Sequence, residues 1–189
     1  METEPEVLPA APEPAAPALQ DEFWTLDTMW RTAQRIANTA IVPSAIRGKP
    51  DAVIAVMLTG REISREPMAS LAAIDFIDGK PSLNALGMRA VVVGRGHQIE
   101  TLEADAEHAV VFGRRADTKQ EEKVTWTIAE AEAAGLLQGK DGPRLNWKRW
   151  PADMNVARAT ARLCRRLFSD CILGVAYLPE ELEEVNDAS

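Results

Sequence analysis

Apolar residues spaced three or four positions apart predict several helices along the chain. Proline near the start of some of these stretches and Gly94-Arg95-Gly96 at the end of another fit the predicted boundaries. The predicted helices span residues 23–40, 49–61, 83–93 and 154–168, and shorter helical pieces span 68–73 and 129–135. Pro151 is expected to set the start of the last long helix.

Short stretches with strand character, joined by short polar links, occupy the middle of the chain. The predicted strands span residues 97–103, 108–115 and 123–128. Short links favour an antiparallel meander, and Asp78-Gly79 earlier in the chain is typical of a hairpin or tight reversal. This order of elements predicts an α+β fold, with helices around a small antiparallel three-stranded sheet and a long C-terminal basic helix.

Charge is distributed unevenly over the 189 residues. The net charge is -8, yet residues 1–22 hold six acids and residues 178–189 hold five, with no lysine or arginine in either segment. The rest of the chain contains the remaining 18 acids and all 21 lysines and arginines. We therefore expect a disordered acidic tail at 1–22, one domain at 23–178 with a site for a polyanion, and an acidic C-terminal tail at 179–189.

The composition also bears on location. No apolar run approaches the roughly 20 residues that a membrane-spanning helix needs, and the acidic N-terminus lacks the basic and apolar regions of a signal peptide. A cytoplasmic location is the expectation. Cys164 and Cys171 are too few for a disulfide framework and are predicted to be buried thiols.

Arginines form a row on the last predicted helix. At about 100° per residue, Arg158, Arg162, Arg165 and Arg166 fall within an arc of roughly 100°, with apolar residues on both sides of the arc. We interpret this row as the lining of a groove, because the guanidinium group matches phosphate oxygens and keeps its charge. The competing interpretation pairs these arginines with acids on neighbouring elements.

Two further groups are candidates for the same site. Lys148-Arg149-Trp150 precedes Pro151, and cations interleaved with tryptophan suit single-stranded nucleic acid. Trp147 and Trp150 themselves are predicted to be core residues that clamp the helix. Arg89, Arg95 and His97 flank the Gly94–Gly96 turn, which is either a weak phosphate site or a plain helix stop.

Catalytic signals are weak. His97 and His108 lack a cluster of further metal ligands, so no metal or cofactor is expected. Glu121-Glu122-Lys123 resembles half of a nuclease motif, with Pro50-Asp51 as the other half. However, an acid in the first turn of a helix and charge at a strand edge both have structural explanations.

Four blocks of residues follow one another between about residues 40 and 182. They are Ile41-Val42-Pro43 through Gly48-Lys49-Pro50 with Leu58-Thr59-Gly60-Arg61-Glu62; Pro67-Met68-Ala69-Ser70-Leu71 with Ile77-Asp78-Gly79-Lys80-Pro81; Met88 through Arg95-Gly96-His97; and Gly142-Pro143 with Trp150-Pro151, Met154, Arg158-Ala159, Arg165, Phe168 and Asp170. In these blocks the chain resembles the RecT/Red Beta family of phage-type single-strand DNA annealing proteins.

The resemblance implies a non-enzymatic protein that binds single-stranded DNA without ATP and pairs it with a complementary strand during recombination. It further implies a small sheet against a long helix, a homo-oligomer (ring or filament), a phage-encoded 5′→3′ exonuclease as partner, and a phage or prophage protein in the bacterial cytoplasm. Arg158 and Arg165 match basic positions of the family's long helix. Ala152 and Asp153 depart from positions that are often basic in relatives.

The expected DNA-binding residues of the annealing domain are Arg158, Arg162, Arg165, Lys148, Arg149, Arg95, His97, Arg89 and Lys80. A passive single-strand binder is the main alternative. A metal-dependent nuclease is a weaker one.

Overall fold

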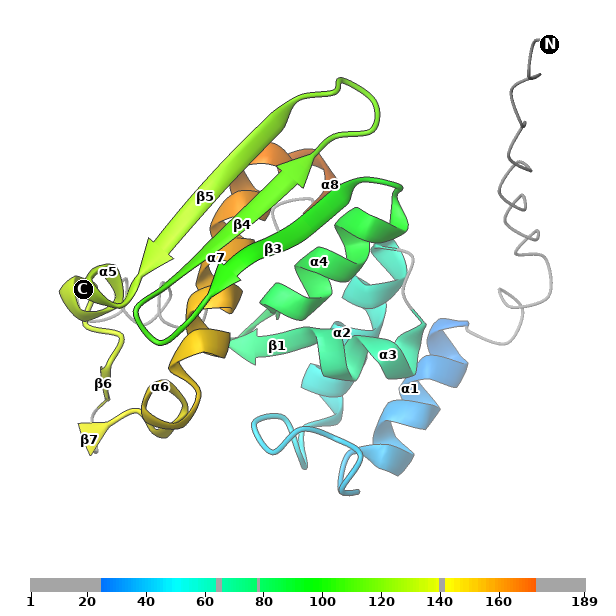
Figure 1. The fold of residues 1–189 in the computed structure, drawn as a ribbon. Coiled ribbons are helices and arrows are strands. Elements are labelled where there is room, and N and C mark those ends of the chain that lie inside the picture. The colour runs from blue at the N-terminus through cyan, green and yellow to red at the C-terminus, as the bar shows by residue number, and fades with distance from the viewer. Residues whose placement is uncertain (1–24, 64–65, 78, 140–141, 173–189) are drawn as a thin grey trace, which may run out of the picture.

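The computed structural model describes residues 25–63, 66–77, 79–139 and 142–172 (Figure 1). Both acidic tails expected from the sequence, at 1–22 and 179–189, lie outside these residues. Among the described residues, no helix has the length and apolar character that crossing a membrane requires.

The N-terminal part of the structure is helical and leads into a small hairpin. Its elements are α1 (Leu26–Ile36), α2 (Pro50–Glu62), α3 (Pro67–Ala73), β1 (Ile74–Ile77), β2 (Lys80–Leu83) and α4 (Ala85–Gly94). The hydroxyl of Thr25 caps α1, and proline occupies the first turn of α2 and of α3. β1 and β2 pair antiparallel, which confirms the reversal expected near Gly79.

The central sheet is the predicted antiparallel meander. It consists of β3 (Gln98–Ala104), β4 (His108–Arg114) and β5 (Glu121–Thr127), in that spatial order. The pairing of β3 with β4 shifts by one residue between Thr101 and Glu103, which marks a β-bulge. β4 is therefore the central strand, and β3 and β5 are the edges of the sheet.

Short elements link the sheet to the long C-terminal helix. They are α5 (Ile128–Ala133), β6 (Gln138–Gly139), β7 (Gly142–Pro143) and α6 (Leu145–Arg149), followed by α7 (Pro151–Leu167) and α8 (Ser169–Ile172). Thr127 and Glu130 form a capping box at the start of α5. Pro151 occupies the first turn of α7, as expected.

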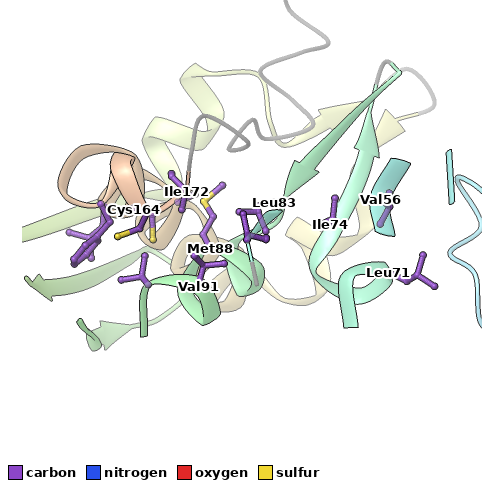
Figure 2. Packing of buried hydrophobic residues seen from close by; sticks show 14 of the residues in the cluster. Val56, Leu71, Ile74, Leu83, Met88, Val91, Cys164 and Ile172 are labelled. Atoms are coloured by element: carbon purple, nitrogen blue, oxygen red, sulfur yellow. The ribbon is translucent and has the colours of Figure 1, made fainter. Parts of the chain in front are cut away.

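Helices α4 and α7 cover one face of the three-stranded sheet, and no described helix or strand lies over its other face (Figure 1). Gly113 on β4 allows the close approach of α7. A Cβ atom at Gly113 would lie 2.9 Å from Leu163 Cδ2 and 3.0 Å from Phe168 Cε2. The core continues from this interface through Met88 and Leu83 to the N-terminal helices (Figure 2).

The structure confirms the α+β class predicted from the sequence, with a three-stranded antiparallel sheet and a long C-terminal helix. Several helix boundaries differ, and the first expected helix ends at Ile36 rather than at residue 40. The helix expected to start at residue 83 starts two residues later, because the side chain of Asn84 accepts a hydrogen bond from the Gly87 N–H and caps α4. Leu83 instead ends β2 and is fully buried.

Candidate nucleic-acid interface

The first two arginines of the row on α7, Arg158 and Arg162, turn toward the sheet. Arg158 is only 5% exposed, and its guanidinium carbon lies 5.9 Å from the ring centroid of Trp126 on β5. The guanidinium of Arg162 lies closer to the same ring, at 4.2 Å. Both side chains thus form cation–π contacts that hold α7 against the edge of the sheet.

Arg162 also forms an ion pair. Its Nη1 lies 2.8 Å from Oε1 of Glu130 and donates a longer hydrogen bond, 3.3 Å, to the carbonyl oxygen of Thr125. Burial alone would raise the pKa of Glu130, but the hydrogen bonds from Arg162 and from the Thr127 backbone outweigh burial and lower that pKa. Arg162 is therefore committed to contacts within the fold.

The remaining two arginines of the row are also engaged. Half-buried Arg165 donates from Nε to the carbonyl oxygen of Ala161, and exposed Arg166 lies 3.3 Å from Glu122 of β5. The expectation of an open groove lined by the row is therefore wrong for Arg158, which is buried. Arg162 and Arg166 pair with acids on neighbouring elements, as the competing interpretation expects.

Side chains around the Gly94–Gly96 turn fasten it to neighbouring elements. The ring of His97 stacks on Phe168 with 5.3 Å between centroids, and its Nδ1 accepts a hydrogen bond from the Ala116 N–H. Arg95 is exposed and donates to the carbonyl oxygen of Asp170. These contacts fasten the turn between α4 and β3 to the C-terminal end of α7, and Arg95 is exposed whereas His97 is half-buried.

Two of the predicted DNA-binding arginines donate hydrogen bonds to backbone carbonyls on the edge strands of the sheet. Arg89 of α4 donates to the carbonyl oxygen of Ile99 on edge strand β3, at 3.1 Å. Arg162 of α7 does the same to Thr125 on the opposite edge strand. A carbonyl that already accepts a hydrogen bond from an arginine is a poorer partner for an added strand, so both contacts protect the edges.

Two exposed cations of the predicted site lie just before α7. The side chains of Lys148 and Arg149 are exposed, and neither side chain forms a hydrogen bond or an ion pair with any described residue. Trp150 follows them with 62% of its surface exposed. The side chain of Lys80, at the start of β2, is likewise exposed and has no such partner among the described residues. Lys80, Lys148 and Arg149, with Arg95, are the predicted site residues that are exposed.

Trp147 and Trp150 differ in burial because the chain changes direction between α6 and α7. Trp147 is 4% exposed and anchors α6, which confirms its predicted core position. The same prediction is wrong for Trp150. Its φ of -135° and ψ of 52° lie outside the helical region, so it does not share one helical face with Trp147. A sequence signal existed, because proline disfavours helical backbone at the preceding residue.

One charged cluster was not expected from the sequence. Arg115, only 12% exposed, contacts Asp117 at 2.7 Å and Asp170 at 2.6 Å. The hydrogen bonds from Arg115 lower the pKa of Asp170 to about 2. The two acids neutralise Arg115, so this cluster stabilises the fold and adds no free positive charge.

Most of the residues considered for a metal site or a nuclease have other contacts in the structure. Among the residues described, no group of three or more histidine, cysteine or acidic side chains is arranged to hold a metal ion. The acids of the nuclease-like motif form ion pairs within the fold. Glu121 pairs with Arg114 at 3.3 Å, and Glu122 pairs with Arg166. Asp51 lies in the first turn of α2, where an acid favours the helix dipole.

Comparison of the chain with protein-family models, with curated proteins and with solved structures finds no match. The function must therefore be argued from the site itself and from the sequence blocks described above.

Proposed function

We propose that this protein binds single-stranded DNA and anneals complementary strands without ATP, as part of homologous recombination. The observation that carries the proposal is the exposed segment Lys148-Arg149-Trp150. It combines two cationic side chains that have no partner among the described residues with an exposed indole. The four sequence blocks that resemble the RecT/Red Beta family support the same function. The partners that we propose with it are further copies of this chain and a phage-encoded exonuclease, in the bacterial cytoplasm.

The site suggests how strands are brought together. Lys148 and Arg149 contact phosphate groups, release counterions and reduce the repulsion between two strands. Lys80 and Arg95 are the other exposed members of the predicted set and extend this contact along the backbone. Contacts to phosphate leave the base edges free for a second strand to read. Arg158 and Arg162 act indirectly, because they position α7 on the sheet.

A salt titration tests the role of the exposed cations. In the double variant Lys148→Gln/Arg149→Gln, affinity for a single-stranded oligonucleotide should fall, and the slope of log affinity against log salt should decrease by roughly 0.7 for each lost phosphate contact. Fluorescence anisotropy at several salt concentrations measures both quantities.

The matched control is Arg35→Gln/Lys123→Gln. It removes the same charge from α1 and from β5, at exposed residues that also lack partners among the described side chains. If both double variants lost affinity equally, the effect would be one of net charge, and the segment before α7 would not be the site.

An annealing assay separates the proposal from a passive single-strand binder. Two complementary labelled oligonucleotides are mixed with the protein in the absence of ATP. The proposal expects faster duplex formation with the wild type and slower formation with Lys148→Gln/Arg149→Gln. Binding without any acceleration of duplex formation would establish the passive binder instead.

A further inference from the structure

Backbone hydrogen bonds hold Trp150 at the junction between α6 and α7. Its N–H donates to the carbonyl oxygen of Asn146 at 2.8 Å, and its own carbonyl oxygen accepts from the Met154 N–H at 3.0 Å. Trp150 therefore ends α6 and begins α7 at the same time. Trp147 anchors α6 in the core, and Pro151 restricts the next residue. The exposed indole thus projects from a part of the chain with little backbone freedom.

The exposure of Trp150 sets it apart from the other described tryptophans. Trp126 is 9% and Trp147 4% exposed, and Trp30 is half-buried, whereas Trp150 is 62% exposed. Leaving so large an aromatic surface in water forgoes the stabilisation that burial would give. A rigidly placed, solvent-exposed indole is suited to bind a flat partner.

The charge around Trp150 indicates which partner that is. The described residues from Gly142 to Asp153 include three cations, Arg144, Lys148 and Arg149, and one acid, Asp153. A cationic surround favours a polyanion, and an indole face favours an exposed aromatic ring. Unpaired nucleotides provide both groups at once, whereas the base faces of a duplex are covered by their neighbours in the stack.

We propose that the indole of Trp150 stacks on an unpaired base and makes this site select single strands over duplex DNA. This inference rests on the proposed function and deepens it, because phosphate contacts alone do not distinguish bases from a bare backbone. Stacking engages the face of a base and leaves its pairing edge free. The contact is therefore compatible with the pairing of a second strand.

Abasic DNA provides the test. An oligothymidine and an abasic oligomer of the same length carry the same phosphates, but only the first offers rings for stacking. The variant Trp150→Ala should bind oligothymidine about tenfold more weakly than the wild type and should bind the abasic oligomer equally well. Trp150→Phe, which keeps an aromatic face, should recover most of the lost affinity.

Leu145→Ala is the matched control, because Leu145 is an apolar residue of α6 with 59% exposure. It should leave both affinities unchanged. Equal losses of Trp150→Ala on both oligomers, or no loss on either, would overturn the stacking inference while leaving the proposed function intact. If Trp150→Ala reduced self-association in sedimentation and not DNA affinity, the indole would be a protein contact and the inference would be wrong. A wild type that bound neither oligomer would overturn the proposed function as well.

Discussion

Arg115 shows how one side chain joins three parts of the chain. It donates to Asp117 in the loop between β4 and β5, to Asp170 of α8, and to the carbonyl oxygen of Leu167 at the end of α7. Its guanidinium carbon also lies 6.0 Å from the centroid of the Phe168 ring. Because both carboxylates must be ionised to make these contacts, the cluster makes stability depend on pH.

The variant Asp170→Asn tests whether this cluster makes stability depend on pH. The pKa of Asp170 is about 2, below the value of about 3.9 expected in the unfolded chain. A lowered pKa stabilises the fold above the unfolded value, and this stabilisation is lost as pH falls from about 4 toward 2. Asp170→Asn should therefore be less stable than the wild type at pH 7 and should lose less stability on acidification.

Urea denaturation at pH 7, 4, 3 and 2.5 measures this difference. Glu100→Gln is the control, because it removes one exposed acid from the outer face of β3. Equal acid sensitivity of Asp170→Asn and the wild type would show that the contact with Arg115 contributes nothing to stability.

The packing of α7 on β4 positions the candidate site. Leu163, Leu167 and Phe168 of the C-terminal segment lie directly over Gly113. The other end of α7 begins at Trp150, so a shift of the helix on the sheet displaces the exposed segment as well. Interiors are closely packed, and such an interface tolerates little added volume.

We expect Gly113→Val to destabilise the fold by about 1–3 kcal/mol, because its side-chain atoms would overlap Leu163 and Phe168. Thr125→Val on the outer face of β5 is the control, with an expected change within about 0.5 kcal/mol. Urea denaturation of both variants gives the comparison. A stable Gly113→Val variant would mean that α7 shifts freely on the sheet, and its DNA affinity would then show whether the site depends on helix position.

The helices and strands could be predicted from the sequence more fully than the contacts between them. Alternation and helical spacing are local signals, so the three strands of the meander and the start of α7 at Pro151 were predicted. Contacts between distant residues leave no such signal. The helical arc located Arg158 and Arg162 on one side of α7, but only the fold shows that Trp126 of β5 covers that side. The same limit applies to Arg115, whose partner Asp170 is distant in sequence.

The structure reduces the number of surfaces through which copies of this chain could associate. Open strand edges and the exposed side of α1 are natural candidates for such contacts. Arg89 and Arg162 occupy carbonyls on both edges, which disfavours the addition of a strand at those positions. Helix α4 presents another surface, because Leu86 is 71% and Val93 48% exposed. Seven residues apart on a helix, they lie on the same side.

We therefore expect copies of this chain to associate through helical surfaces rather than through sheet edges. In sedimentation velocity with single-stranded DNA, Leu86→Glu/Val93→Glu should give smaller assemblies than the wild type, because burying two carboxylates at a contact is costly. Arg162→Ala, which uncovers the Thr125 carbonyl, should leave the assembly size unchanged. Larger assemblies of Arg162→Ala together with unaffected Leu86→Glu/Val93→Glu would instead identify the edge of β5 as the contact. A wild type that stayed monomeric with and without DNA would exclude both routes.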